Sequence, residues 1–364
     1  MSAETASIAR LHAVEVSGDE SVVEGPLHGY HHETYVFPLL GEMGRVRPGR
    51  WKCREPRADL LWFDRRCFVS EEQLLQALAG RIRGIPEIVE VGGLGLMRFI
   101  EGRTLGSVCS TGSPVPAVYR RQIIDLFEQL VTLAPASISA GRRCEPDDRP
   151  DDGDTEGFLE RLVHFTEHRV YRHNLDRFET LFSELGLGED SFKHLRKHVS
   201  GLNERPFCLL HADLHRENFI VDPGRRLWTI DWELAMVGDP LYDLATHLHL
   251  MRYPDRQARG MAEQWRTTVE RVRPGSANGW RQDLNRLIDY KRAQSVFTDV
   301  IRAALSLDTP VSAGWRHVVP VALKLRGILA EAARPLGLEA LPGPHRVVTA
   351  LGRWCRVHGS GREM

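Results

Sequence analysis

Three oxygen-bearing side chains follow one another closely in the segment FCLLHADLHRENFIVDPGRRLWTID, residues 207–231. His211 leads to Asp213, Asn218 comes five residues after Asp213, and Asp231 ends the segment. Mg²⁺ prefers oxygen ligands and keeps some of its waters, so the Asn218 amide and the Asp231 carboxylate are suitable partners for it. A separate carboxylate, Asp213, can then orient an attacking hydroxyl and accept its proton. This division of labour is that of kinase phosphoryl transfer.

The same segment contains the elements that must position these side chains. FCLLH and NFIVD read as short strands, and LWTID reads as a third strand after the turn PGRR. The hairpin brings the three side chains to one end of a small sheet. The alternative is that Asp and Asn only form turns here, which they often do. A zinc site of His211 and His215 is disfavoured, because no helix places both on one face.

At these residues the chain resembles the aminoglycoside phosphotransferase and choline kinase superfamily. HADLHREN is similar to the HGDLHxxN loop of that family, IDWE to its IDFE or IDWE, and GDPLYDLA to the helix start that follows. The likeness extends from about Leu27 to Leu305. It implies an α+β, bilobal, protein-kinase-like fold, with a small β-rich nucleotide-binding lobe in residues 1–103 and a larger, mainly helical catalytic lobe in residues 104–364.

The resemblance also implies roles for single residues. Asp213 would be the catalytic base, and Asn218 and Asp231 the Mg²⁺ ligands. His211 would be a structural member of the loop that bonds the backbone near Asp231. Ala212 stands where the family usually has glycine.

A turn that begins at Gly29, GYHHETYVFPL, looks like the family's G-x-x-N-E-T-Y turn between the first two strands. His32 stands where asparagine is usual. Backbone N–H groups in such a turn can contact phosphate oxygens. A plain hairpin turn is the alternative reading.

The basic group for the nucleotide phosphates is either Lys52 or Arg54 in the strand RWKCREP. Both side chains point to the same face, because strand residues alternate. The resemblance of REP to the family's R-x-P favours Arg54, whereas a flexible ammonium is the commoner choice. Glu71 is the expected acid that holds this base, although an exposed acid in the first turn of a helix is ordinary.

The remaining pattern separates a β-rich first part from a helical second part. The first hundred residues read as strands and turns, interrupted by one helix, SEEQLLQALAG, with Ser70 as N-cap. From about Ser113 onward apolar residues recur at helical spacing, for example in YRRQIIDLFEQLVTLA. The polar stretch GRRCEPDDRPDDGDTEG is expected to be an exposed or disordered loop.

Composition limits the partners and the compartment. The 364 residues carry a formal net charge of −1, so no overall basic field attracts nucleic acid or anionic membranes. The N-terminal residues lack a secretory pattern, and no apolar run reaches the roughly 20 residues of a membrane span. Six cysteines without CxxC spacing indicate reduced thiols in a cytoplasmic protein.

Only a few residues separate Asp231 from Gly238, so the peptide-docking segment of protein kinases is missing. The resemblance therefore implies a phosphotransferase that uses ATP or GTP with Mg²⁺ on a small-molecule hydroxyl, in antibiotic resistance or biosynthesis. Asp239, Asp243 and Asp299 are acids that can grip a cationic acceptor, or the first two brace the catalytic loop. Nearby tryptophans and tyrosines allow an aromatic cage for a choline-like acceptor, contributed by Trp228, Trp232, Tyr242 and Tyr253.

Two alternatives remain open at this stage. One is the same chemistry on a Ser or Thr of a ribosomal peptide with a partner protein. The other is a nucleotide-binding pseudokinase.

Overall fold

The computed structural model describes residues 7–27, 32–57, 65–308 and 315–358. These residues form two compact units, and the chain passes between them repeatedly. Unit 1 comprises Met1–Glu145, Cys208–Val237 and Leu250–Arg273, and unit 2 comprises Pro146–Phe207, Gly238–His249 and Pro274–Met364. The α+β fold class expected from the sequence is confirmed, with an N-terminal antiparallel sheet and a largely helical remainder. The lobe boundary near residue 103 stays a prediction.

Unit 1 is built on a five-stranded antiparallel sheet with the strand order β1-β2-β3-β5-β4. Its strands are β1 Glu24–Leu27, β2 His32–Pro38, β3 Arg50–Pro56, β4 Ile88–Val91 and β5 Leu94–Arg98. β2 and β3 pair over their whole length, so that Thr34 lies opposite Arg54. β3 and β5 pair only at Trp51↔Arg98 and Lys52↔Met97.

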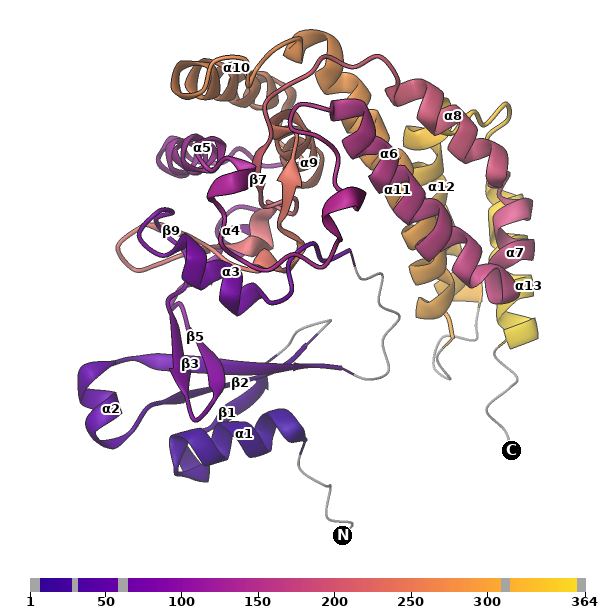
Figure 1. Ribbon diagram of the computed structural model, residues 1–364. Coiled ribbons are helices and arrows are strands. Elements are labelled where there is room, and N and C mark those ends of the chain that lie inside the picture. The colour runs from indigo at the N-terminus through magenta and orange to yellow at the C-terminus, as the bar shows by residue number, and fades with distance from the viewer. Residues whose placement is uncertain (1–6, 28–31, 58–64, 309–314, 359–364) are drawn as a thin grey trace. The chain divides into compact units, whose positions relative to one another are not determined.

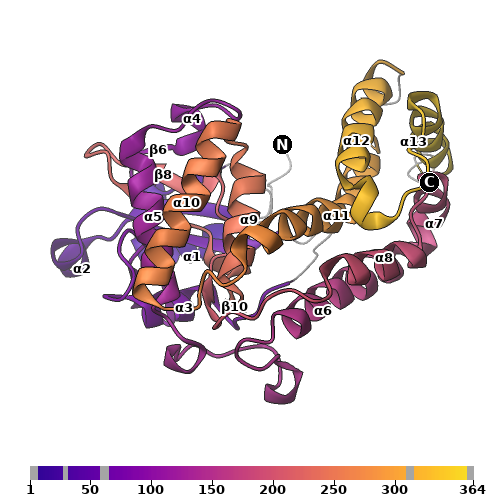
Figure 2. The same ribbon diagram turned by 90° about the horizontal axis from the view of Figure 1, so that it is seen from above.

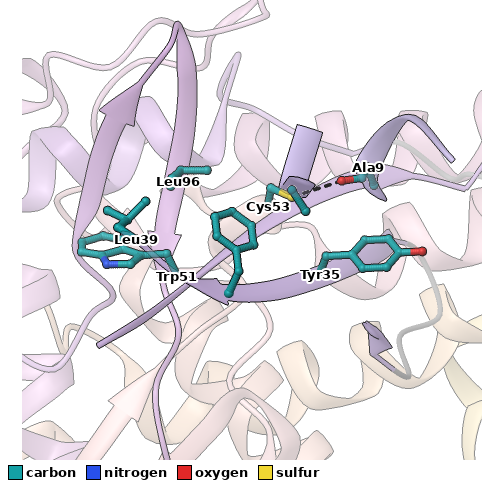
Figure 3. Close-up of a cluster of buried hydrophobic side chains, with 8 residues drawn as sticks. Ala9, Tyr35, Leu39, Trp51, Cys53 and Leu96 are labelled. Atoms are coloured by element: carbon teal, nitrogen blue, oxygen red, sulfur yellow. Dashed lines mark hydrogen bonds between the residues drawn. The ribbon is translucent and has the colours of Figure 1, made fainter. Parts of the chain in front are cut away.

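The expectation of a single helix in the first hundred residues is wrong, because α1 Ile8–Ser17 and α2 Gly41–Val46 are also present. α1 packs along β2 and β3 (Figure 1). The Ser7 hydroxyl caps it by accepting from the Arg10 N–H, and Ala9 and Ala13 are buried against the sheet. Figure 3 shows the resulting apolar cluster, in which the Cys53 thiol donates to the Ala9 carbonyl oxygen at 3.4 Å. The cluster consists of Ala9, Ala13, Tyr35, Phe37, Leu39, Trp51, Cys53 and Leu96.

Helix α3, Glu71–Leu78, forms as its sequence predicts. The Ser70 hydroxyl accepts from the Gln73 N–H and so satisfies one donor of the first turn. Glu71 is buried together with the apolar face of Leu74, Leu75 and Leu78. The helix therefore places one carboxylate beneath the sheet.

The rest of unit 1 consists of two small sheets and three helices. The sheets have the strand orders β6-β8-β9 and β10-β7. α5 and α10 lie side by side in both views (Figures 1 and 2). The elements are β6 Arg103–Thr104, α4 Leu105–Val108, α5 Ala117–Val131, β7 Cys208–Leu210, β8 Phe219–Val221, β9 Leu227–Thr229, β10 Met236–Gly238 and α10 Asp255–Val272.

Unit 2 is helical. An aromatic cluster holds its helices together, and in it the rings of Phe192 and Phe297 stack at a centroid distance of 4.6 Å. Trp354 of the last helix stacks on Phe178 at 5.2 Å. The polar stretch before the first helix of this unit is ordered enough to cap it, since Asp154 accepts from the Gly157 N–H. The helices are α6 Thr155–Phe165, α7 Leu175–Glu184, α8 Glu189–Val199, α9 Pro240–Met251, α11 Trp280–Ser306, α12 Trp315–Leu336 and α13 Pro344–His358, with a π-helical turn at Thr166–Tyr171.

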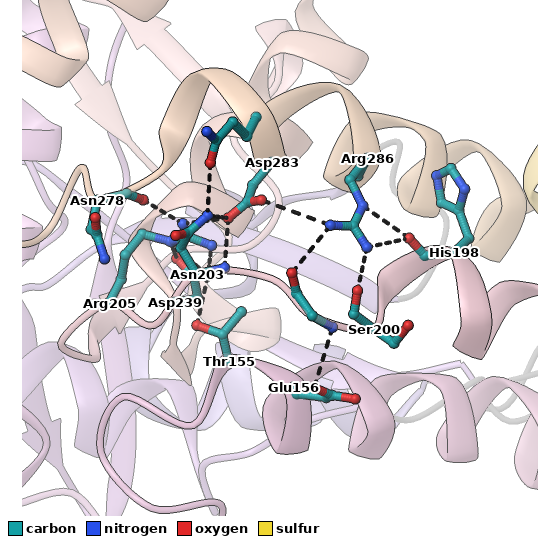
Figure 4. Close-up of polar contacts among 12 residues, drawn as sticks. Thr155, Glu156, His198, Ser200, Asn203, Arg205, Asp239, Asn278, Asp283 and Arg286 are labelled. Carbon is teal, nitrogen blue, oxygen red and sulfur yellow. Dashed lines mark hydrogen bonds and ion pairs between the residues drawn. The ribbon is translucent and has the colours of Figure 1, made fainter.

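A buried charge network joins the helices of unit 2 (Figure 4). The Arg205 guanidinium donates to both carboxylate oxygens of Asp239 and, at 2.8 Å, to Asp283. Thr155 donates to the same Asp239 carboxylate at 3.1 Å. Arg205 and Asp239 are almost fully buried. Asp239 therefore braces the start of α9 and does not offer its charge to an acceptor.

Two further features bear on the sequence predictions. Among the described residues, no helix combines the length and the apolar character that a membrane crossing needs. None of the six cysteines, all of which are described, forms a disulfide.

Removal of Arg205 tests the buried network. We expect Arg205→Ala to lower the free energy of unfolding by about 3–5 kcal/mol, because it leaves Asp239 and Asp283 buried without their cation. Arg161→Ala, which removes an exposed ion pair with Asp148, is the control and costs less than about 1 kcal/mol. Urea unfolding followed by circular dichroism measures both. Equal stability of the two variants would contradict the assigned role of Arg205.

Candidate active site

The loop that follows β7 gathers the residues of the HADLHREN motif. The Asn218 amide nitrogen donates to the Asp213 carbonyl oxygen at 2.9 Å and to Asp213 Oδ2 at 3.1 Å. These bonds use the amide nitrogen and fix the orientation of the amide. The Asn218 side-chain oxygen takes part in neither bond. Ala212 adopts a φ of 62°, in the left-handed region that favours glycine. This backbone conformation gives a physical reason for the glycine that the family usually has there.

His211 joins this loop to the strand that ends at Asp231. Its Nε2 donates to the Ile230 carbonyl oxygen at 3.1 Å, the kind of backbone contact that the sequence predicted for it. Its ring lies 4.7 Å from the Trp232 ring. Burial lowers the pKa of His211, so the neutral imidazole is favoured.

Asp231 also has a left-handed backbone, with φ 65° and ψ 62°. Its side chain remains 39% exposed, so the carboxylate is accessible to a ligand. Such a backbone costs of order 1–3 kcal/mol in a non-glycine residue and persists only where its surroundings hold it. Here two hydrogen bonds hold it. One is made by His211 to the residue before Asp231, and the other by a carboxylate to the residue after Asp231.

That second contact comes from Glu71 of α3, whose side chain is 3% exposed. Glu71 Oε1 accepts from the Trp232 backbone N–H at 2.7 Å. Its Oε2 forms an ion pair with Arg54 Nη2. Arg54 Nη1 in turn lies 3.8 Å from Asp231 Oδ1. One buried carboxylate therefore links the basic residue of β3 to the backbone beside Asp231.

Lys52 points to the same face of β3 but takes no part in this arrangement. Among the described residues it has no hydrogen bond or ion pair. Burial, helped by the charge of Arg54, lowers the pKa of Lys52 to about 8. Of the two candidates, Arg54 thus occupies the position beside Glu71 and Asp231.

The predicted nucleotide turn is only partly described. Gly29 lies outside the described residues. His32 begins β2, and its Nε2 lies 3.7 Å from Glu233 Oε2. Burial and the charge of Asp231 raise the pKa of Glu233 to about 7, against the opposing effect of Arg54. Glu233 was missed as a site residue, although it is the last letter of IDWE.

Two further residues of the loop were also missed. His215 Nε2 lies 3.4 Å from Asp213 Oδ2, and the bond to Asp213 raises the pKa of His215 although burial opposes it. Arg216 is buried and donates to three backbone carbonyls, those of Cys109, Ser113 and Met251. The sequence signal for both was their position two and three residues after Asp213. His215 orients the Asp213 carboxylate, and Arg216 anchors the loop.

The other acids and aromatic residues considered from the sequence are mostly interior. Asp243 is 1% exposed and Asp299 is half-buried. Trp232 and Tyr242 are each buried in their own unit, and Tyr253 lies under Arg216. These positions do not present the aromatic faces that a cage for a choline-like cation needs.

The donor atoms near Asp231 suit a magnesium ion. The side-chain oxygen of Asn218 and the carboxylate of Asp231 are hard oxygen ligands, and Mg²⁺ commonly keeps waters at its remaining positions. Within the described ranges no cluster of three or more His, Cys, Asp or Glu forms a fuller metal cage. Asn218 and Asp231 are therefore the residues that fit such a metal.

The fold and this site define a kinase-like phosphotransferase. Residues 47–274 match the model of the phosphotransferase enzyme family, which is more than half of the chain. The chain therefore belongs to the phosphotransferase enzyme family, and the resemblance seen in its motifs is confirmed.

Three solved structures share the fold. A putative aminoglycoside phosphotransferase from Ralstonia eutropha is 14% identical with a TM-score of 0.51, over 90% of this chain and 91% of that one. A thermostable mutant of aminoglycoside phosphotransferase APH(4)-Ia, in complex with ADP and hygromycin B, is 16% identical with a TM-score of 0.50, over 96% and 99%. The macrolide 2′-phosphotransferase MphH from Brachybacterium faecium is 16% identical with a TM-score of 0.50, over 91% and 99%.

The two contacts of Glu71 can be separated by mutation. We expect Glu71→Ala to lower the free energy of unfolding by about 3–5 kcal/mol, because it breaks a buried ion pair and leaves the Trp232 N–H without its acceptor. Glu71→Gln keeps an oxygen for the Trp232 N–H and costs about 1–2 kcal/mol less. Glu42→Gln, at an exposed position of α2, is the control with little effect. Chemical denaturation measures all three, and equal losses for Ala and Gln would exclude the Trp232 bond.

Arg216 is expected to be a positioning residue. Arg216→Ala leaves three carbonyl oxygens without their donor and should cost about 2–4 kcal/mol of stability. Hydrogen exchange should speed up first in the segment that carries Asp213 and Asn218. Arg121→Ala, an exposed change on α5, should leave that exchange unaltered. Unchanged exchange in Arg216→Ala would show that the loop does not depend on this anchor.

Proposed function

We propose that this protein transfers the γ-phosphoryl group of ATP or GTP to a hydroxyl of a small molecule. The observation that carries the proposal is the shared guanidinium of Arg54, which pairs with Glu71 and lies 3.8 Å from Asp231 Oδ1. Phosphoryl transfer needs a basic side chain on the nucleotide phosphates close to a carboxylate that binds the metal. Arg54 and Asp231 would supply these two groups. Lys52 has no such placement.

In the proposed reaction, the acceptor hydroxyl lies against the Asp213 carboxylate. Asn218 and His215 hold Asp213 Oδ2, so the carboxylate is oriented before the acceptor arrives. The hydroxyl oxygen attacks the γ-phosphorus, the bond from that phosphorus to the β–γ bridging oxygen breaks, and the hydroxyl proton passes to Asp213. Arg54 stabilises the charge that develops on the phosphate oxygens.

Asn218 and Asp231 are the residues that would hold Mg²⁺. When bound there, the ion supplies charge neutralisation for the phosphate oxygens. Glu71 keeps Asp231 in its left-handed conformation through the Trp232 N–H and directs Arg54 toward the same place. His32, the first residue of β2, lies 3.7 Å from Glu233 next to this site.

Two observations support a small molecule as the acceptor: the short segment that follows Asp231 and the ligands named for similar structures. The short turn Trp232–Leu234 and β10 directly follow Asp231, so no peptide-docking segment intervenes. The similar structures include one with hygromycin B and one named for macrolides. We propose a hydroxyl-bearing small molecule of that general kind, with antibiotic modification or biosynthesis as the setting and the cytoplasm as the location.

Nucleotide binding and slow hydrolysis test the assigned roles. We expect the native chain to bind ATP or GTP only weakly without Mg²⁺ and at least about tenfold more tightly with it. Asp231→Ala should lose this metal-dependent gain, because it removes a carboxylate ligand. Asp213→Asn should bind like the native chain but hydrolyse ATP at least about 100-fold more slowly.

Asp255→Asn is the matched control, because Asp255 is exposed at the start of α10 in the same unit. It should leave both binding and hydrolysis unchanged. Failure of the native chain to bind either nucleotide with Mg²⁺ would overturn the proposed function. Binding without any hydrolysis or transfer to an acceptor panel would indicate a nucleotide-binding pseudokinase instead.

A further inference from the structure

A pocket of about 430 Å³ lies within unit 1, beside the C-terminal half of β3. It exists because β3 and β5 part after Lys52: β3 continues to pair with β2, and β5 pairs with β4. α3 covers the opening, and a Cβ built on Gly95 would lie only 3.2 Å from Glu72 Cγ. The size is within the usual range for small-molecule sites.

This pocket is distinct from the catalytic loop. Its lining comes from β3, α3, the β4–β5 hairpin and His12 of α1. Among the described residues, none from the segment 208–237 lines it. Of the described residues, it shares Arg54 with the site beside Asp231, where Arg54 pairs with Glu71.

Lys52 is the basic group that gives the pocket its character. Arg54 is committed to Glu71, whereas Lys52 has neither a hydrogen bond nor an ion pair within the described part of the chain. Burial lowers the pKa of Lys52 to about 8, so a bound anionic group would stabilise its charged form. The charges of Asp231 and Glu72 act on this half-buried ammonium, but no acid forms an ion pair with it within the described part of the chain, so it can receive a carboxylate or phosphate.

Carboxylates and amides line the other walls. Glu72 and Glu90 contribute acids, and Gln73 and Gln76 contribute amides that can donate or accept. Two of the acids are already engaged: Glu55 is paired with His12 at 3.4 Å, and Glu72 accepts from the Ser70 hydroxyl and lies 4.0 Å from Arg54 Nε. Glu90 is the exposed acid of the lining. An anion without a positive group would be repelled by these acids, and a cation without a negative group would be repelled by Lys52. A molecule with both charges satisfies both sides.

We propose that this Lys52 pocket is a second binding site, for a small zwitterionic molecule such as an amino acid, whose anionic group contacts Lys52 and whose ammonium contacts Glu90. The occupant would lie against α3 next to Glu71. Binding therefore provides a route by which a small metabolite adjusts the Arg54–Glu71 pair. That regulatory consequence rests on the proposed function, whereas the binding itself does not.

A ladder of amino acids with increasing charge separation tests the site. The probes are glycine, β-alanine, γ-aminobutyrate and 5-aminovalerate, with butyrate and butylamine as single-charge controls. Isothermal titration calorimetry on the full native chain should show binding of at least one zwitterion at least about tenfold more tightly than either control. Equal or undetectable binding of all six compounds up to millimolar concentrations would overturn the proposal.

Variants then locate the bound molecule. Lys52→Met keeps the length of the side chain and removes its charge, so it should weaken the best zwitterion at least about tenfold. Glu90→Gln should weaken the same probe, whereas Lys324→Met, an exposed change in unit 2, should not. Thermal unfolding checks that each variant is folded. A native affinity retained in both Lys52→Met and Glu90→Gln would place the probe elsewhere and refute the assignment.

Nucleotide titrations on the same samples separate this proposal from the proposed function. Native chain that binds zwitterions but not nucleotide with Mg²⁺ would keep the pocket and reject the phosphotransferase site. If Lys52→Met lost nucleotide affinity to the same extent as zwitterion affinity, Lys52 would serve the nucleotide and the pocket proposal would fail.

Discussion

The Glu71 carboxylate holds the site together, because it is buried and both of its oxygens are engaged. Burial of a carboxylate is costly unless a cation and hydrogen-bond donors meet it. Arg54 supplies the cation and the Trp232 N–H supplies a donor. The position of α3, the direction of Arg54 and the backbone beside Asp231 are therefore mutually dependent. A shift of any one of them leaves a buried charge without its partner.

Backbone strain accompanies this arrangement on both sides of the hairpin. Ala212 and Asp231 have φ values of 62° and 65°, in a region that costs side-chain-bearing residues of order 1–3 kcal/mol. Ala212 follows His211, which donates to the Ile230 carbonyl oxygen. Asp231 precedes Trp232, whose N–H donates to Glu71 of α3. The His211 contact to Ile230 ties the two strained segments to each other. The strained backbone thus lies at and beside the residues that carry the site's carboxylates, Asp213 and Asp231. The hydrogen bonds on either side hold it in that conformation.

The sequence predicted the fold class, α3 and the hairpin well, because these depend on local caps, apolar periodicity and a compact motif. It missed α1, whose small buried residues, Ala9 and Ala13, gain their meaning only against the sheet. It did not decide between Lys52 and Arg54, since both lie on one face of β3 and only the placement of α3 distinguishes them. The contacts of Arg216 reach residues more than one hundred positions earlier, which no local pattern reveals.

The path of the chain between the two units has a consequence for synthesis on the ribosome. The chain passes from one unit to the other after residues 145, 207, 237, 249 and 273, so neither unit is continuous. The sheet that carries Arg54 emerges early, but Asp231 and Trp232, which contact Arg54 and Glu71, follow only after a long stretch of unit 2. At translation rates of roughly 5–20 residues per second, the sheet waits on the order of ten seconds for them. During that time Glu71 lacks the Trp232 N–H and Arg54 lacks Asp231, so the arrangement around Asp231 cannot form.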